Sequence, residues 1–389
     1  MSNWLQWINV LVLCGLLIYI VHFNQFRTRK HFPVQSLLQY KESNNIQYTD
    51  ISIILLWTAW FHHHWPIRLG GHTCSNCKHH CYFTVESKYF SKADAVVFHA
   101  TDMHRMEDAL LPNISSKPIH QRWVYYTMEN PPISIQLGIK VEPRDEKKFD
   151  WIMSYTRDAD VHAPYGYALP GRYGQGFDPN INYAQGRSKM IVMVASRCYP
   201  TRMKMVHELQ RYISVDIYGD CGMKCSRDRK CWKFIKDNYK FYLSFENEVC
   251  KDYITEKLYN NAFGNYLIPI IISGANYSDS RVIPPNSFID ALKFKNVQRL
   301  ASYIKKVADD NKLYNSYFQW RNHYDIKIRN MKDTLCALCR KTSLQKALPQ
   351  TSRPYANLRY VLGNHDGNCK QFPDPYHLNA VKRNFSYFK

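Results

Sequence analysis

The sequence predicts an α/β fold. Short apolar runs, rich in isoleucine, valine and aromatic residues, alternate along the chain with segments in which apolar residues recur at helical spacing. This alternation favours strands that pair in parallel and are joined by crossover helices. Apolar residues make up 45% of the chain and aromatic residues 15%, so the chain can bury ordinary cores and does not have the composition of a disordered protein.

The predicted strands are the apolar runs at residues 51–60, 95–100, 123–128, 191–195, 215–218, 241–245 and 267–272. Between several of them lie predicted helices, at residues 203–212, 255–262 and 297–309. Glycine and proline are concentrated between residues 164 and 186, and such residues interrupt regular structure. We therefore predict a linker between two domains at this point.

The 389 residues fit two domains of ordinary size. We predict six segments: an anchor with a short tail at 1–23, a stem at 24–48, a first domain at 49–165, the linker at 166–186, a second domain at 187–345 and a C-terminal extension at 346–389.

The amino-terminal segment predicts a membrane anchor. Residues 1–26 contain no Lys, Arg, Asp or Glu, and the apolar run at 4–23 has the length of ~20 residues that a bilayer requires. Aromatic residues lie at both of its ends, where interfacial side chains belong. The segment lacks a charged n-region and a small-residue cleavage site, so an uncleaved anchor is favoured over a signal peptide.

Two observations disagree about the orientation of this anchor. Arg27, Arg29 and Lys30 follow it, and the positive-inside rule would place them in the cytoplasm. Eleven cysteines after the anchor and three glycosylation sequons, at Asn113, Asn276 and Asn384, indicate instead that the large part is luminal. We predict the luminal orientation.

The formal net charge of +20 favours an anionic partner, which includes nucleic acid, phospholipid and phosphate-bearing small molecules. A basic, zinc-stapled nucleic-acid-binding protein is one alternative of a different class. The predicted anchor, the sequons and the lack of a recognisable nucleic-acid-binding motif disfavour it.

The cysteines occur in groups: Cys74, Cys77 and Cys81; Cys221, Cys225 and Cys231; and Cys336 with Cys339. In a reducing compartment this spacing would favour zinc, whereas in an oxidising lumen it favours short-range disulfides that staple loops. The pairing cannot be deduced from the sequence, and an odd luminal count leaves at least one thiol unpaired or intermolecular.

Two other patterns resemble metal ligands only superficially. The adjacent residues His62, His63 and His64 cannot all point in one direction, so an exposed loop edge is favoured. Asp158 and Asp160 have the Asp-x-Asp form of many metal-dependent sugar transferases, but this tripeptide is also common by chance.

Residues 240–259 carry the most informative pattern, an apolar strand followed by a polar loop and a helix that begins near Thr255. Thr255 is a candidate helix cap, and phosphate groups are favoured at a helix N-terminus. Lys257 would add a point charge for a pyrophosphate, Glu256 would accept hydrogen bonds from sugar hydroxyls, and Tyr253 would stack or hydrogen-bond. The alternative is that Glu256 and Lys257 are exposed helix residues and Tyr253 is a core residue.

This stretch resembles the signature of the α1,3/1,4-fucosyltransferases, Phe-Glu-Asn followed by Asp-Tyr-Ile-Thr-Glu-Lys-Leu. The resemblance continues in the same order through further motifs at residues 121–124, 129–131, 149–158, 194–197, 268–271, 276–277, 285–289 and 314–321. Together they cover most of residues 50–340.

The resemblance implies a Golgi type II membrane protein with a GT-B fold, in which two Rossmann-like domains face a cleft. The C-terminal domain would bind GDP-fucose and the N-terminal domain the glycan acceptor. The reaction would transfer L-fucose from GDP-β-L-fucose, with inversion, to a hydroxyl, usually O3, of N-acetylglucosamine. The alternatives are a fucosyltransferase for another acceptor, such as the N-glycan core, and a non-catalytic relative that binds a GDP-sugar or a glycan.

The resemblance also implies the site residues. Glu129 would be the general base that takes the proton of the acceptor hydroxyl, and Arg202 would contact phosphate. The remaining donor-binding residues would be Asn247, Tyr253, Glu256 and Lys257. Because Arg202 and Lys257 can stabilise the departing GDP, no metal site and no cofactor are expected to be required, although manganese stimulation stays possible.

Overall fold

The computed structural model describes residues 51–74, 79–103, 111–136, 148–171, 176–225, 229–346, 358 and 368–381. The predicted anchor and stem, Cys77 and the sequon at Asn384 lie outside this set. Within it, no helix has both the length and the apolar character that crossing a membrane requires.

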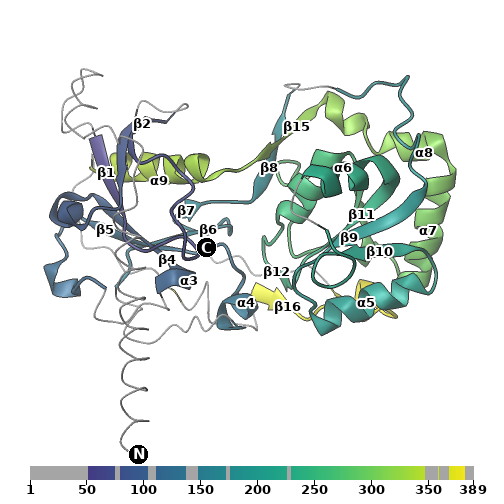
Figure 1. The fold of residues 1–389 in the computed structure, drawn as a ribbon, viewed down its shortest axis with the longest axis horizontal. Helices are drawn as coiled ribbons and strands as arrows, with labels where there is room; N and C mark the ends of the chain where they lie inside the picture. Colours follow the sequence, from purple (N-terminus) through teal and green to yellow (C-terminus); the bar gives the residue numbers. More distant parts are fainter. Residues whose placement is uncertain are drawn as a thin grey trace, which may run out of the picture. The chain divides into compact units, whose positions relative to one another are not determined.

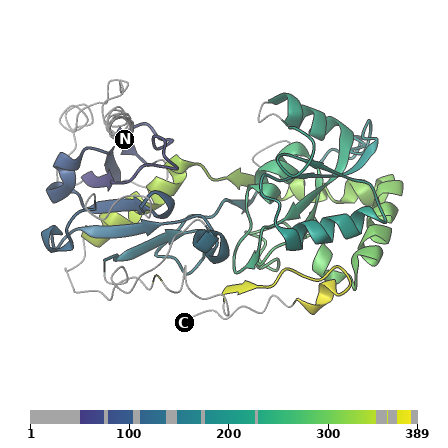
Figure 2. The same cartoon turned by 60° about the horizontal axis from the view of Figure 1, so that its bottom comes forward.

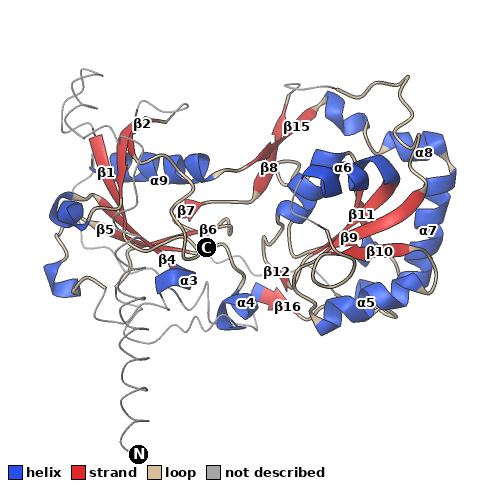
Figure 3. Cartoon of the chain, in the orientation of Figure 1, coloured by secondary structure: helices blue, strands red, loops and turns tan. Residues whose placement is uncertain are grey.

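The protein has an α/β fold with two large sheets (Figures 1 and 3). The first has the strand order β2-β3-β1-β4-β5-β6-β7 and the second the order β10-β9-β11-β13-β14. The chain divides into two compact units, one within Met1–Tyr126, Lys148–Asp150 and Met331–Pro354, the other within Thr127–Lys147, Trp151–Asn330 and Tyr355–Lys389.

The strands of the first sheet are β1 (Ile51–Leu56), β2 (Gly70–Thr73), β3 (His80–Thr84), β4 (Ala95–His99), β5 (Arg122–Tyr126), β6 (Trp151–Ser154) and β7 (Val161–His162). Strand β1 pairs in parallel with β3 and β4, and only β2 is described as antiparallel to its neighbour. Every residue of β1, β4 and β5 is buried, which explains why these strands are predominantly apolar. The three strands predicted at 51–60, 95–100 and 123–128 are thereby confirmed.

The second sheet lies wholly in the second unit. Its strands are β9 (Lys189–Val194), β10 (Val215–Tyr218), β11 (Tyr239–Phe245), β13 (Ile268–Ile272) and β14 (Ile289–Asp290), and all of its pairings are parallel. The four strands predicted in this region are confirmed. Parallel pairing requires crossover connections, and the helices that provide them cover the sheet.

The helices are α3 (Ala100–Met103), α4 (Pro131–Gln136), α5 (Pro200–Gln210), α6 (Arg229–Asn238), α7 (Val297–Asp309), α8 (Asn311–Ser316) and α9 (Met331–Lys346). Helix α7 has the bounds that the sequence predicts. Asn296 caps it by accepting a 3.0 Å hydrogen bond from the backbone N–H of Arg299. Its buried residues follow helical spacing: Val297, Leu300, Ala301, Ile304, Val307 and Ala308.

The 3₁₀-helices are η2 (Ser87–Lys92), η4 (Ile114–Ser116), η6 (Phe263–Asn265), η7 (Ala291–Lys293), η8 (Gln319–Asn322) and η9 (Leu378–Ala380), and η5 (Lys257–Ala262) is a π-helix. Two antiparallel ribbons complete the described structure, β8 (Gly166–Pro170) with β15 (Tyr324–Ile328) and β12 (Val249–Cys250) with β16 (Cys369–Lys370).

The units depart from the predicted segments. Residues 127–136 and 151–165, predicted as part of the first domain, belong to the second unit. The first five residues of the predicted linker, 166–170, form strand β8, because β15 is available to pair with them. Helix α9, predicted as the end of the second domain, belongs to the first unit. The disulfides Cys74–Cys336 and Cys81–Cys339 join it to that unit.

The C-terminal extension is partly structured in the second unit. Figure 2 shows its described segment, which contains β16 and η9, lying along that unit. The backbone N–H of Val297 donates to the Pro375 carbonyl at 2.9 Å, and the N–H of Leu378 donates to the Lys295 carbonyl at 3.0 Å. Leu378 is fully buried in the core of the second unit, so the extension contributes to that core.

The ten cysteines that the structure describes form five disulfides: Cys74–Cys336, Cys81–Cys339, Cys198–Cys221, Cys225–Cys231 and Cys250–Cys369. The prediction of disulfides is confirmed, but the expectation that they are short-range is wrong for three of them, whose partners are 262, 258 and 119 residues apart. Five disulfides indicate an oxidising compartment of the secretory pathway.

We expect glycosidase treatment to lower the mass of the full chain expressed in a eukaryotic secretory host. Asn113 is exposed, and its side-chain oxygen accepts a hydrogen bond from the backbone N–H of Ser115 at 3.0 Å, so its sequon lies on an accessible turn. Replacing Asn113 with glutamine should remove one glycan from the mass spectrum. An unchanged spectrum for this variant would contradict glycosylation at Asn113.

Candidate active site

The carboxyl edge of the second sheet gathers polar side chains. Arg197 follows β9, Glu246 and Asn247 follow β11, and Ser273 follows β13. In an open parallel sheet, ligands bind outside the carboxyl ends of the strands. The strands bring together residues that are far apart in the sequence, and all of them belong to the second unit.

Glu246 is the centre of this group and is fully buried. Its carboxylate accepts hydrogen bonds from the backbone N–H of Thr255 at 2.8 Å and from the Thr255 hydroxyl at 3.0 Å. The Lys257 ammonium group donates to it at 2.8 Å and to the Thr255 hydroxyl at 3.1 Å. A buried carboxylate is tolerated only with such partners, so Glu246 fixes both the loop and the lysine.

The Lys257 side chain is 12% exposed and carries a positive charge in this setting. Burial opposes the charge, but the carboxylates of Glu246 and Glu256 outweigh burial and raise the pKa of Lys257. Glu256 lies 3.7 Å from the ammonium group and is about half exposed, with 53% of its side chain accessible. Lys257 is therefore a fixed cation at the edge of the sheet.

Arg202, on α5, is the second buried cation, at 1% exposure. Its guanidinium group donates to the side-chain oxygen of Asn247 and to the backbone carbonyl of Arg197. Its Nε atom is buried without a hydrogen-bond partner among the described residues. Arg202 thus orients Asn247 and the loop after β9, and it retains one unsatisfied donor.

Tyr253 is 3% exposed and packs in an edge-to-face arrangement against Tyr155, with ring centroids 4.9 Å apart, and against Tyr165 at 6.1 Å. Burial raises the pKa of Tyr253 well above its usual range, so the phenol keeps its proton. The Tyr165 hydroxyl donates to the carbonyl of Met128 at 2.7 Å, which connects this aromatic group to the residue before Glu129.

Glu129 is half-buried immediately before the N-cap of α4. Asn130 caps that helix, with its side-chain oxygen accepting from the Ile133 N–H at 3.0 Å. Burial raises the pKa of Glu129, Arg197 and Lys257 lower it, and Glu256 raises it. The carboxylate therefore lies within electrostatic reach of two cations, with an affinity for protons above that of an ordinary glutamate.

The structure gathers the predicted residues of the site in the second unit, in two linked groups. Glu129, Glu256 and Lys257 interact electrostatically, and Arg202 contacts Asn247 directly. Tyr253 lies in the aromatic group that includes Tyr165.

Two residues were not singled out from the sequence, Glu246 and Arg197. The sequence signal for Glu246 is a carboxylate directly after a largely apolar strand, a position that demands a charged or hydrogen-bonding partner.

The helix predicted at 255–262 forms as the six-residue π-helix η5, Lys257–Ala262. The Thr255 hydroxyl oxygen accepts from the backbone N–H of Lys257 at 3.4 Å, as expected of a cap, while the N–H and hydroxyl of Thr255 both donate to Glu246. A π-turn of this length aligns few peptide dipoles, so the charges of Lys257 and Arg202 dominate the local field.

The two metal-like patterns have structural partners. Asp158 accepts from the Lys251 ammonium group at 2.5 Å, and Asp160 accepts from the backbone N–H of Ile152 at 2.9 Å. His62, His63 and His64 form an exposed turn, as predicted. In the part of the chain that the structure describes, no group of three or more His, Cys, Asp or Glu residues is arranged to hold a metal ion.

Gly274 allows the loop 247–253 to lie against the sheet edge. A Cβ atom at this position would come within 1.9 Å of the Cys250 carbonyl oxygen, and the Asp252 N–H donates to the Gly274 carbonyl at 3.2 Å. We expect Gly274→Ala to lower the free energy of unfolding in urea by about 3 kcal/mol or more, because backbone atoms would have to move apart. Gly264→Ala, with no contact closer than 3.7 Å, is the matched control. Equal stability of the two variants would contradict this close packing.

Comparisons with known proteins agree with the resemblance. A model described as fucosyltransferase, N-terminal, matches residues 49–166, and one described as glycosyltransferase family 10 (fucosyltransferase) C-term matches residues 184–359. The alpha-(1,3)-fucosyltransferase C of Drosophila melanogaster is 32% identical over 362 residues, which covers 84% of this chain and 82% of that protein.

The 4-galactosyl-N-acetylglucosaminide 3-alpha-L-fucosyltransferase FUT6 of Homo sapiens is 29% identical over 337 residues, covering 85% of this chain and 90% of that protein. A crystal structure of an alpha1,3-fucosyltransferase with GDP-fucose is 18% identical, with a TM-score of 0.45, and covers 71% of this chain and 83% of that one. The relatives and both family models agree, and the chain belongs to glycosyltransferase family 10, the fucosyltransferases.

Proposed function

We propose that this enzyme is an inverting α1,3-fucosyltransferase. It transfers L-fucose from GDP-β-L-fucose to O3 of N-acetylglucosamine in a glycan of a glycoprotein or glycolipid. The observation that carries the proposal is the electrostatic grouping of one half-buried carboxylate, Glu129, with the cations Arg197 and Lys257. A base and a charge-stabilising group in one site are what transfer to a hydroxyl requires.

Glu129 acts as the general base. The acceptor O3 atom attacks the anomeric carbon of fucose from the face opposite the GDP, and the O3 proton passes to the Glu129 carboxylate. The bond from the anomeric carbon to the phosphate oxygen breaks at the same time, and GDP departs with the electron pair. A single displacement of this kind inverts the β-linkage of the donor and gives an α-fucoside.

Lys257 and Arg202 stabilise the charge that develops on the departing GDP. The Glu246 carboxylate fixes the ammonium group of Lys257 before the donor binds, so little reorganisation is needed during the reaction. The unsatisfied, buried Nε atom of Arg202 is a donor of the type that a phosphate oxygen would accept from. Asn247, Tyr253 and Glu256 complete the donor site, and Glu256 is exposed enough to accept hydrogen bonds from the sugar hydroxyls.

We further propose a GT-B arrangement, with the second unit as the donor domain and the first as the acceptor domain, and a type II anchor in the Golgi membrane. The five disulfides and the basic charge support a luminal enzyme with an anionic donor. Because two protein cations face the leaving group, we propose that a divalent metal is not required, and that manganese at most stimulates turnover.

The proposal is tested by incubating the full chain with GDP-fucose and an array of N-acetylglucosamine-containing acceptors, with and without EDTA. We expect fucosylated product on at least one acceptor and equal yield in EDTA. Product only on the N-glycan core would change the acceptor. Binding of GDP-fucose without any transfer would favour a non-catalytic relative and contradict the proposed activity.

A further inference from the structure

A short segment after strand β6 contacts three consecutive residues of the loop that leads into the proposed donor site. The segment comprises residues 155–158, and we call it the clasp. It reaches Lys251, Asp252 and Tyr253 through a salt bridge, a hydrogen-bonded ion pair and a ring contact. All of these residues belong to the second unit.

The first contact joins Asp158 to Lys251. The two charged groups are 2.5 Å apart, and the lysine side chain is only 2% exposed. A buried ammonium group that lost its carboxylate would be strongly unfavourable, so this contact fixes the start of the loop. The disulfide Cys250–Cys369 fixes Cys250, the residue before Lys251.

The second contact joins Arg157 to Asp252. The Asp252 carboxylate accepts from the backbone N–H of Arg157 at 3.1 Å and lies 3.8 Å from its Nε atom. Asp252 has a φ angle of +57°, in the left-handed region that most residues avoid. Aspartate tolerates this conformation, but surrounding contacts must hold it, and Arg157 supplies those to the carboxylate, while the Gly274 carbonyl accepts from the Asp252 N–H.

The third contact is the packing of the Tyr155 ring against the ring of Tyr253. Tyr253 directly follows the left-handed residue, so the conformation of Asp252 sets the direction in which the Tyr253 side chain leaves the backbone. A change in the Asp252 φ angle would therefore move Tyr253, even though Arg157 does not touch it.

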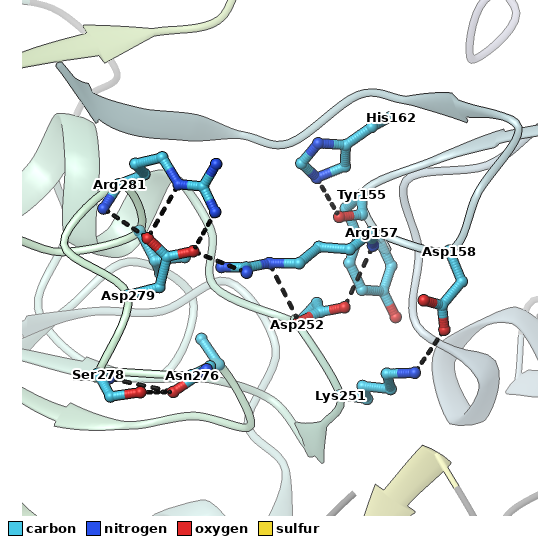
Figure 4. A network of polar contacts seen from close by, with 12 residues as sticks. Tyr155, Arg157, Asp158, His162, Lys251, Asp252, Asn276, Ser278, Asp279 and Arg281 are labelled. Atoms are coloured by element: carbon cyan, nitrogen blue, oxygen red, sulfur yellow. Dashed lines mark hydrogen bonds and ion pairs between the residues drawn. The ribbon is translucent and has the colours of Figure 1, made fainter. Parts of the chain in front are cut away.

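Arg157 is the clasp residue whose side chain contacts two carboxylates, those of Asp252 and Asp279. Figure 4 shows its side chain lying between Asp252 and Asp279, and its Nη1 atom donates to Asp279 at 2.8 Å. Arg281 also binds Asp279, through Nε at 3.1 Å and Nη2 at 3.0 Å, but it is 75% exposed. Arginine suits this place because its planar group can engage two carboxylates at once.

We propose that Arg157 is a positioning residue for the sugar-nucleotide donor, which it aligns by holding Asp252, and through it Tyr253, in the conformation that receives the nucleotide sugar. The inference rests on the proposed function, in which Tyr253 contacts GDP-fucose. It goes beyond that function by assigning a role to a residue outside the donor-contacting set.

The test is calorimetric titration of the full chain with GDP-fucose, since the dissociation constant and the fraction of competent protein are measured separately. Arg157→Gln should raise the dissociation constant on the order of 10-fold, because small displacements of site residues weaken productive binding. A purely structural role would lower the competent fraction and leave the dissociation constant of the remaining molecules unchanged.

Two variants control this result. Arg281→Gln removes an arginine that contacts Asp279 but has no described contact with Asp252, and its dissociation constant should stay within about twofold of wild type. Arg157→Lys keeps the charge without the planar fork, and it should restore part of the affinity. Asp252→Asn, which tolerates the left-handed conformation, serves if Arg157→Gln does not fold, and should weaken binding less than about 10-fold but measurably.

The results of these titrations distinguish failure of the positioning role of Arg157 from failure of the proposed function. If the wild-type chain binds GDP-fucose and neither Arg157→Gln nor Asp252→Asn changes the dissociation constant, the positioning role is overturned and the proposed function stands. If the wild-type chain binds no GDP-fucose, the proposed function fails and the positioning role fails with it. Weaker binding in Arg157→Gln, with Arg281→Gln unchanged, supports the inference.

Discussion

Replacing Glu129 with glutamine is expected to lower kcat on the order of 10²–10⁴-fold and to leave the affinity for GDP-fucose close to that of the wild type. Glutamine has the shape of glutamate but cannot take the proton from the acceptor hydroxyl. The proposed donor-binding cations Lys257 and Arg202 are unchanged in this variant, so the effects on binding and on turnover should separate. Kinetics and calorimetry on the same preparation measure both quantities.

The role of Glu129 as the base also predicts how kcat depends on pH. Burial raises the pKa of Glu129, and the base must be ionised to act. Wild-type kcat should therefore fall as the pH decreases through this raised pKa, above the 4.5 of an ordinary glutamate. The residual activity of Glu129→Gln should lack this acidic limb.

The surface variant Glu86→Gln, at an exposed position with 47% of its side chain accessible, should retain wild-type kcat. Turnover by Glu129→Gln at the wild-type rate would exclude Glu129 as the base.

Replacing Lys257 with methionine is expected to weaken GDP binding and to destabilise the fold by about 3–5 kcal/mol, the usual cost of breaking a buried ion pair from one side. Glu246 would remain buried without its opposing charge, and its already raised pKa would rise further, so that it would take up a proton. Urea denaturation and calorimetric titration with GDP measure the two effects.

The double variant Glu246→Gln/Lys257→Met separates stability from binding. It removes both charges, so no buried charge is left unpaired, and much of the lost stability should return. GDP affinity should not return, because the cation that we propose faces the phosphate is still absent. Recovery of GDP binding in the double variant would dissociate Lys257 from the phosphate.

The sequence predicts the sheets well because their strands are buried on both faces. Strand β13 is a continuous apolar run and β4 and β11 are nearly so, and a run of this kind has few alternatives in an α/β chain. Helix α7 was predicted to the residue, since its buried positions keep one helical stripe and Asn296 marks its start.

Long-range contacts could not be predicted in the same way. The pairing of Cys74 with Cys336 depends on α9 packing in the first unit, which no local pattern indicates. Thr255 accepts from the Lys257 N–H as a cap would, but its own N–H and hydroxyl bind Glu246, and the following turn winds as a π-helix. In each case a partner outside the local segment contributes to the outcome.

The candidate site was predicted from family motifs rather than from local chemistry. Glu129 has no distinguishing pattern around it, and the structure adds its half-buried position near Arg197 and Lys257. Glu246 was missed although it lies within the quoted signature, because its importance comes from burial beside Lys257. Burial of a single polar residue depends on tertiary structure and is not visible in a local pattern.

Proton NMR of the purified product tests directly whether the enzyme transfers fucose to O3 with inversion. The full chain is incubated with GDP-β-L-fucose and an N-acetylglucosamine-containing acceptor, and the anomeric signal and linkage of the new sugar are determined. We expect an α-fucoside on O3 of N-acetylglucosamine, formed by inversion. A β-fucoside, or no product although GDP-fucose is bound, would contradict it.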